Sequence, residues 1–239
     1  MTRTAALPLA LLGAACASAP GPEAALAPEP AVSSPVALAD PQAVAEAERA
    51  FARAAREDGT WTAFRRFATG DAVWPNPGLV SVQGDLADQT DPAEAIVWGP
   101  DNVWSSCDGS FAVSTGSAIH PDGRKTRFVT VWQRQEDGAY KWVIDQGFDL
   151  EEDYVAPEGL TAETATCAGP LTPRAVRRGE AWGSAASDDG TLAWHTAFAP
   201  DCARELSVTV RGAAGMGEVA RWSAHAPAVP EGREPVVCG

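Results

Sequence analysis

Histidine is scarce in this chain: the 239 residues include only His120, His195 and His225. Histidine is the commonest metal ligand and the commonest acid–base group of enzymes, so its scarcity counts against metalloenzymes and most hydrolases. The Gly-x-Ser-x-Gly elbow of serine hydrolases and the His-Glu-x-x-His pattern of zinc peptidases are both absent. The glycines between Gly212 and Gly217 lack the Lys-Ser/Thr that completes a phosphate-binding loop. We therefore expect neither a metal ion nor a cofactor.

Basic residues are also few. Lysine and arginine together number 18 against 32 acidic residues, which gives a formal net charge of −14. Binding to nucleic acid or to an anionic membrane surface requires a basic patch, and the pairs Arg65-Arg66 and Arg177-Arg178 are too short to provide one. We expect no nucleic-acid partner, and contact with a membrane only through the N-terminus.

The apolar segment near the N-terminus, Ala5 to Ala15, is about eleven residues long and too short to cross a bilayer. With the positive charge of Arg3 before it, the segment is typical of an export signal over residues 1–15. Leu11 to Cys16 resembles a bacterial lipoprotein cleavage box, which implies that Cys16 carries lipid. Cleavage by ordinary signal peptidase after Ala17 or Ala19 is the alternative.

Residues 16–39 are rich in alanine and proline and nearly uncharged, so they are expected to form a flexible tether. Alanine, not aspartate, follows Cys16. By resemblance to bacterial lipoproteins, this favours anchoring in the outer membrane, with the protein in the periplasm.

Besides Cys16 the chain contains four cysteines, namely Cys107, Cys167, Cys202 and Cys238. An even number in an oxidising compartment favours disulfides, and four cysteines allow three pairings. We prefer Cys202 with Cys238, which would hold the C-terminal segment, and Cys107 with Cys167. Free buried thiols are the alternative. No Cys-x-x-Cys spacing occurs, so a zinc or thiol-redox site has little support.

Three strands joined by two Asp-Gly turns are the clearest structural signal, and they cover Ser110–His120, Lys125–Gln135 and Ala139–Gln146. Asp-Gly between alternating apolar runs is a strong hairpin signal, because tight hairpin turns need positive φ. Two amphipathic helices precede these strands, one beginning at Asp40-Pro41 and one running from Thr60 to Gly70. This order predicts an α+β fold with a curved sheet wrapped around helices.

The remaining segments predict shorter elements. Asp71–Pro75 and Val97–Ser106 are expected strands. Leu79–Thr90 is an expected loop, with an edge strand at Val80 and Val82 as the alternative. Asp91–Ile96 has the cap, proline and glutamate of a short helix. A second β-meander is expected over Glu180–Ala186, Thr191–Phe198, Glu205–Arg211 and Glu218–His225. We thus expect one domain over residues 40–150 and a β-rich extension over residues 151–239, which is too small to bury a large core alone.

The residues that carry a family resemblance are Glu48–Phe51, Phe64–Ala68, Trp98–Pro100, Asp108–Gly116 and Val129–Gln135. In this order they resemble the nuclear transport factor 2-like cone, in its SnoaL-like branch, over residues 41–148. The resemblance implies helices packed in a strongly curved antiparallel sheet, a pocket between them, and homodimers formed through the outer face of the sheet. The second meander could instead cover that face. The cone serves isomerases, cyclases, dehydratases, carriers and non-catalytic domains, so it does not determine function.

Strand alternation predicts which side chains line the pocket. Along the third strand Trp142 and Ile144 share one face, whereas Val143 and Asp145 share the other. We expect the aromatic face to point inward, which would leave Asp145 outside. The expected ligand-binding residues are Trp61, Trp74, Trp98, Trp104, Phe128, Trp132 and Trp142.

Two carboxylates are candidates for catalysis. Asp145 would act as a general acid or base if, against this expectation, it faced the pocket, and Asp71 is expected near the pocket mouth. The alternative is that both are ordinary surface or turn residues. We favour a non-catalytic envelope protein that binds a small apolar molecule or a protein partner. The second hypothesis is an isomerase, cyclase or dehydratase that uses Asp145 or Asp71.

Overall fold

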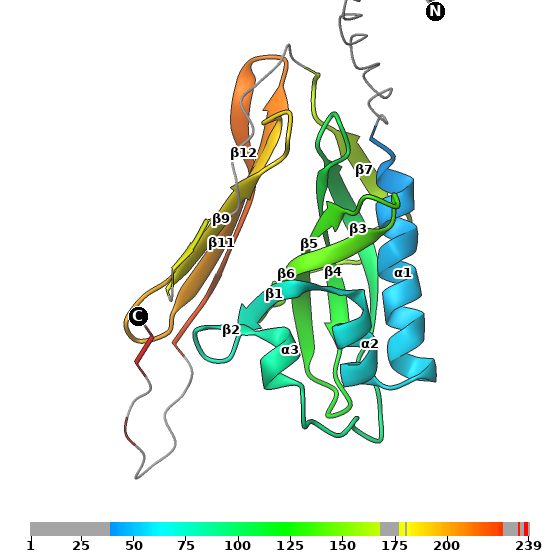
Figure 1. Ribbon diagram of the computed structural model, residues 1–239, viewed down its shortest axis with the longest axis vertical. Helices are drawn as coiled ribbons and strands as arrows, with labels where there is room; N and C mark the ends of the chain where they lie inside the picture. The colour runs from blue at the N-terminus through cyan, green and yellow to red at the C-terminus, as the bar shows by residue number, and fades with distance from the viewer. Residues whose placement is uncertain (1–38, 168–176, 180, 227–233, 235–236, 239) are drawn as a thin grey trace, which may run out of the picture. The chain divides into compact units, whose positions relative to one another are not determined.

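The computed structural model describes residues 39–167, 177–179, 181–226, 234 and 237–238 (Figure 1). The expected signal segment, most of the tether and Cys16 lie outside these residues. The described chain forms three helices, a seven-stranded sheet and a five-stranded sheet. The helices are α1 (Pro41–Glu57), α2 (Thr60–Phe67) and α3 (Val82–Asp85). None of the described helices is both long and apolar enough to span a bilayer.

The first sheet is strongly curved around the helices, as the sequence predicts (Figure 1). Its strands are β1 (Ala68–Pro75), β2 (Leu79–Ser81), β3 (Val97–Ser105), β4 (Phe111–Ile119), β5 (Lys125–Arg134), β6 (Tyr140–Asp149) and β7 (Thr161–Thr164). Their order is β2-β1-β6-β5-β4-β3-β7. The pairings are antiparallel except for β1 with β6 and β3 with β7, which are parallel. The predicted Asp-Gly turns are confirmed, with φ values of 81° at Gly123 and 85° at Gly138.

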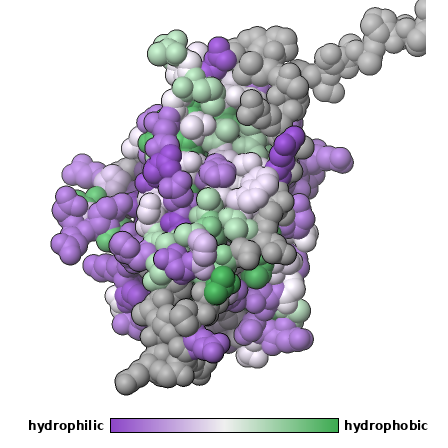
Figure 2. Space-filling view, turned by 90° about the vertical axis from the view of Figure 1, so that its left-hand side faces the viewer, coloured by the Kyte–Doolittle hydropathy of each residue, from purple (hydrophilic) through white to green (hydrophobic). Residues whose placement is uncertain are grey.

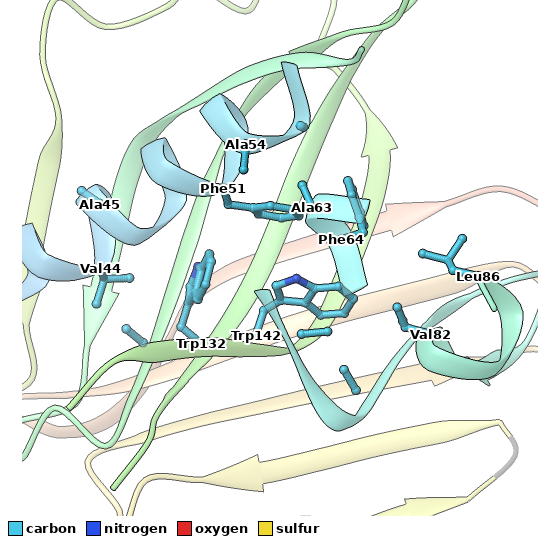
Figure 3. Packing of buried hydrophobic residues seen from close by; sticks show 14 of the residues in the cluster. Val44, Ala45, Phe51, Ala54, Ala63, Phe64, Val82, Leu86, Trp132 and Trp142 are labelled. Atoms are coloured by element: carbon cyan, nitrogen blue, oxygen red, sulfur yellow. The ribbon is translucent and has the colours of Figure 1, made fainter. Parts of the chain in front are cut away.

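Helix α1 forms the core together with the concave side of this sheet. Asp40 caps its first turn by accepting hydrogen bonds from the backbone N–H groups of Gln42 and Ala43. Phe51 then packs against the indoles of Trp132 and Trp142, with ring centroids 6.2 and 6.4 Å away (Figure 3). Both tryptophans are fully buried. This aromatic layer anchors the helix to β5 and β6.

The short helix expected over Asp91–Ile96 is wrong, because Asp91 caps a different helix. Its carboxylate accepts hydrogen bonds from the backbone N–H of Thr62 at 3.0 Å and from the Thr62 hydroxyl at 2.6 Å. Helix α2 has no capping side chain of its own, since Gly59 occupies its N-cap position. A carboxylate 29 residues further along the chain therefore completes the helix, and its own segment stays irregular.

A β-bulge in β6 overturns the expected faces of the third strand. Trp132 pairs with Trp142 and Val131 pairs with Ile144, so Val143 is an extra residue with no partner of its own in the ladder. Val143 and Ile144 both pack on the convex side of the sheet. One additional residue reverses the alternation that follows it. Trp142 points into the cone as predicted, and Asp145 does too, against the prediction.

The second sheet is antiparallel throughout and corresponds closely to the predicted meander. Its strands are β8 (Arg177–Gly179), β9 (Trp182–Ala186), β10 (Leu192–Phe198), β11 (Arg204–Gly212) and β12 (Gly215–Ala224), in the order β12-β11-β10-β9-β8. Trp194, Leu206 and Val208 bury their side chains in one cluster with Val129 and Val131 of the first sheet. This packing occupies the sheet face that the resemblance assigned to a homodimer.

The opposite side of the second sheet is mixed in character. Among its described residues the exposed large hydrophobic side chains are Trp182, Met216 and Val219. On the side of the molecule where β9 and β12 are labelled in Figure 1, Figure 2 shows hydrophobic areas broken up by hydrophilic ones.

Two acidic turns join the sheets by reciprocal hydrogen bonds. The Asp108 carboxylate accepts a hydrogen bond from the backbone N–H of Asp189 at 3.0 Å, and the Asp189 carboxylate accepts one from the N–H of Asp108 at 3.0 Å. Each carboxylate also accepts a hydrogen bond within its own turn, from Ser110 or from Thr191. The two turns share the pattern Ser-x-Asp-Gly followed by a hydroxyl residue. The same local motif therefore supplies both halves of the contact.

Two disulfides add covalent links, Cys107–Cys167 and Cys202–Cys238. The pairing is the one preferred from the sequence. Cys107 directly precedes Asp108, and Cys202 lies in the turn between β10 and β11. The first bond closes a separation of 60 residues and the second one of 36.

Replacing Asp189 with alanine tests whether the paired turns hold the sheets together. We expect Asp189→Ala to lower the free energy of unfolding by about 1–3 kcal/mol, because buried N–H donors lose a charged acceptor. Urea denaturation followed by tryptophan fluorescence measures this. Asp137→Ala is the matched control, since Asp137 occupies an exposed Asp-Gly turn where it caps Ala139. Equal losses in the two variants would contradict the assignment.

Candidate active site

A cavity of about 490 Å³ opens inside the cone. Four of the predicted ligand-binding residues line it, namely Trp61, Trp74, Trp98 and Phe128. Trp61 and Trp74 meet edge to face with their ring centroids 5.8 Å apart. They come from α2 and β1, whereas Trp98 and Phe128 come from β3 and β5. Aromatic walls of this kind suit an apolar molecule.

The other three predicted aromatic residues have different positions. Trp132 and Trp142 lie deeper, fully buried in the core between α1 and the sheet (Figure 3). Trp104 lies on the convex side of the sheet, where its ring centroid is 6.1 Å from that of Trp222. Its neighbour Val103 belongs to the core on the helix side, as strand alternation requires. Trp104 therefore serves the contact between the sheets.

Asp145 lines this cavity. The Thr130 hydroxyl, directly opposite on β5, donates a hydrogen bond to its carboxylate at 2.8 Å. Burial raises the pKa of Asp145 to about 7, the negative charge of Glu48 also acts to raise it, and the Thr130 hydrogen bond opposes both effects. A carboxyl group with this pKa both accepts and donates a proton near neutral pH.

Glu48 is a site residue that sequence reasoning misses, because its neighbours Glu46 and Arg49 favour the polar face of the helix. It is fully buried on α1. The Trp98 indole N–H donates to Oε1 at 2.6 Å, while the Ser114 hydroxyl and the Trp132 indole N–H donate to Oε2 at 2.6 and 3.2 Å. Burial raises the pKa of Glu48, and these hydrogen bonds offset part of that rise.

The position of Glu48 has a signal in the sequence. Val44, Glu48, Phe51 and Ala55 follow the i, i+4, i+7, i+11 spacing of one helix face. A glutamate on an otherwise apolar face is the sign of a buried carboxylate. Because Glu46 and Arg49 flank it, the residue is easily assigned to the polar face instead.

Asp71 is not part of this arrangement. It is exposed on β1, and the Thr69 hydroxyl donates a hydrogen bond to its carboxylate at 2.8 Å. The next residue, Ala72, is fully buried in the core on the helix side, so alternation turns Asp71 away from the core. The structure thus separates the two aspartates that the sequence offered as candidates.

The histidines have three different environments. His120 contacts the Thr126 hydroxyl through Nε2 at 3.0 Å and Arg124 through Nδ1 at 3.1 Å. Burial lowers its pKa, and the charge of Arg124 lowers it further. His225 lines the cavity, whereas His195 is exposed on β10. Among the described residues, no group of three or more His, Cys, Asp or Glu side chains is placed to hold a metal ion.

Comparison with known proteins yields few matches. No family model and no curated protein matches the chain. Four solved chains match, among them a "putative ketosteroid isomerase" from Parabacteroides distasonis ATCC 8503. That chain is 13% identical, the match covers 49% of the present chain and 98% of the other, and the TM-score is 0.37. The isomerase activity in that name refers to the Parabacteroides protein.

Proposed function

We propose that this protein is a small-molecule enzyme of the isomerase, cyclase or dehydratase type, in which Asp145 moves a proton on a largely apolar substrate. The position of Asp145 carries the proposal. Its carboxyl group lines an aromatic cavity, has a pKa of about 7 and lies under the influence of a second buried carboxylate, Glu48. Functional carboxylates are commonly found in such environments.

The same observation weakens the first hypothesis from the sequence. A non-catalytic binding domain is the better hypothesis when Asp145 lies on the outer face, because the pocket then lacks this acid–base group. The bulge at Val143 brings Asp145 inside. A purely apolar carrier gains nothing from a buried carboxyl group, because its desolvation is unfavourable.

In the proposed reaction, ionised Asp145 removes a proton from a carbon next to a carbonyl group of the substrate. The electron pair of the broken C–H bond moves into the conjugated system, and the carboxylic acid returns the proton to another carbon. Thr130 orients the carboxyl group through its hydrogen bond. Burial keeps the proton on Asp145 up to neutral pH, and Glu48 acts as a positioning residue whose charge adds to that effect.

We also propose that the protein is exported and anchored to the outer membrane through Cys16, with the cone and the β-rich extension in the periplasm. The apolar segment and the Leu11–Cys16 box support export and lipidation. The two disulfides suit an oxidising compartment, because structural disulfides are rare in the cytosol.

Removing the carboxylate of Asp145 tests the proposed chemistry. With a β,γ-unsaturated cyclohexenone as probe, we expect Asp145→Asn to slow conversion to the conjugated ketone by roughly 10²–10⁴-fold, the usual contribution of a general base. The absorbance of the product measures the rate. Asp71→Asn removes an exposed carboxylate from the same fold and should leave the rate unchanged. Equal activity of Asp145→Asn and the wild type would refute the proposal.

The pH dependence gives a second test. Asp145 acts as a base only when ionised, so the rate should rise with pH and level off above about 7. Thr130→Val removes a hydrogen bond that favours the ionised form and should move the inflection to higher pH. Glu48→Gln removes a negative charge and should move it to lower pH. A carbon-13 NMR titration of the Asp145 carboxyl group provides the same pKa values without a substrate.

The raised pKa of Asp145 also affects stability. Because the fold disfavours the ionised form, the contribution of Asp145 to the free energy of unfolding should fall as pH rises from 3.8 to about 7. Asp145→Asn should remove this decline. Denaturation curves across that pH interval measure it, with Asp71→Asn again as the control.

Lipidation of Cys16 is tested by intact-mass measurement of protein extracted from membranes. We expect the mass of the processed chain that begins at Cys16 plus its acyl groups, and we expect Cys16→Ser to remove both the acyl mass and the membrane association. A chain that begins at Ser18 or Pro20 in the soluble fraction would instead indicate ordinary signal-peptidase cleavage.

A further inference from the structure

Two arginines from different parts of the fold line the cavity. Arg204 belongs to β11 of the second sheet, and Arg124 belongs to the turn between β4 and β5 of the first. The second sheet also contributes Ala224, and His225 follows it directly on the cavity wall. In a chain with a net charge of −14, two guanidinium groups on the wall of one aromatic cavity stand out.

Arg204 has unused capacity for hydrogen bonding. Its Nη2 donates to the backbone carbonyl of Gly147, and its guanidinium lies over the ring of Phe148 at 5.5 Å. Its Nε is buried and has no hydrogen-bond partner within the described part of the chain. Buried N–H donors nearly always have an acceptor, so the Arg204 side chain, which lines the cavity, retains unused hydrogen-bonding capacity.

Arg124 lines the cavity with an exposed side chain that contacts a histidine. Its Nη2 lies 3.1 Å from Nδ1 of His120, and Nε2 of His120 lies 3.0 Å from the Thr126 hydroxyl. A neutral His120 accepts from Arg124 and donates to Thr126, which agrees with its lowered pKa. The nearest carboxylate oxygen of Asp122 is 3.9 Å from Nε of Arg124, so the arginine is only weakly paired.

The carboxylates on the cavity wall do not cancel these charges. Burial lowers the pKa of Arg204, and Asp149 offsets part of that effect. Arginine remains charged in either case. Asp145 is largely protonated below neutral pH. The cavity wall thus carries two guanidinium groups beside Asp149 and a largely protonated Asp145.

We propose that the ligand of this cavity is an amphipathic anion, whose apolar body lies among Trp61, Trp98 and Phe128 and whose carboxylate, sulfate or phosphate group binds Arg204 and Arg124. The second sheet is then a specificity element, since it supplies Arg204. The inference rests on the proposed function only in using the same cavity, and it concerns binding alone.

A matched pair of fluorescent probes separates the anionic group from the apolar body. Anilinonaphthalene sulfonate and N-phenylnaphthylamine share one ring skeleton, and only the first carries a negative charge. We expect the purified protein to bind the sulfonate more tightly, and the sulfonate to displace the neutral probe from the same site. Arg204→Gln and Arg124→Gln should each weaken sulfonate binding by about tenfold or more, the usual loss for a charged hydrogen bond, and leave the neutral probe unaffected.

Arg221→Gln is the control for the loss of one positive charge. Arg221 lies on β12 of the same sheet, exposed and paired with Glu205 and Glu218. Its replacement should leave the affinity of both probes unchanged. The inference is overturned if the wild type binds both probes equally, if Arg204→Gln weakens both alike, or if Arg221→Gln has the same effect as Arg204→Gln.

The outcomes for binding and for catalysis are independent. Asp145→Asn should retain the preference for the sulfonate, because Asp145 does not contact the anionic group in this arrangement. Selective sulfonate binding without isomerase activity would refute the proposed function and retain the inference. Activity of the wild type with equal binding of both probes would refute the inference and retain the proposed function.

Discussion

The buried carboxylate of Glu48 connects the helical and β parts of the cone. It lies on α1 and accepts hydrogen bonds from Trp98 on β3, Ser114 on β4 and Trp132 on β5. Leaving such a group unpaired inside a protein would be strongly unfavourable, so the four elements must keep their relative positions for the carboxylate to remain satisfied. This arrangement fixes the direction of the helix and the inward orientation of Trp98 and Trp132. It also places the charge that acts on Asp145. One side chain thus links the packing of the core to the electrostatics of the cavity.

Local chemistry in the sequence is sufficient to predict much of the fold. The Asp-Gly turns and the Asp40-Pro41 start of α1 correspond to what the structure contains. These features depend on neighbouring residues, so short windows of sequence contain them. Asp91 shows the limit, because its helix-cap signature is genuine and serves a helix 29 residues away.

The candidate site is harder to predict from the sequence than the fold is, for a different reason. Asp145 is a candidate from its strand alone, but its side of the sheet depends on whether β6 continues without interruption past Val143. The bulge is a property of the pairing between β5 and β6, where Trp132 opposes Trp142 and Val131 opposes Ile144. Nothing in the order of residues from Lys141 to Gln146 distinguishes a bulged from a regular strand. The burial of Glu48, by contrast, can be predicted, since its spacing from Val44 and Phe51 places it on the buried face of the helix.

The extra residue at Val143 also matters for comparing this chain with others of similar fold. Before Val143 an even-numbered residue of β6, Trp142, faces the inside of the cone. After Val143 an odd-numbered residue, Asp145, faces the inside, so the alternation is reversed. A gain or loss of one codon at this point would exchange Asp145 for its neighbours on the cavity wall while leaving the hydrophobic composition of the strand intact. Homologous chains that differ by a single residue here would then share a scaffold, but only some of them would place an acidic side chain on the cavity wall. The residues of such chains should be aligned by their strand partners across the sheet, because an ungapped sequence alignment would equate residues that face opposite sides of the sheet.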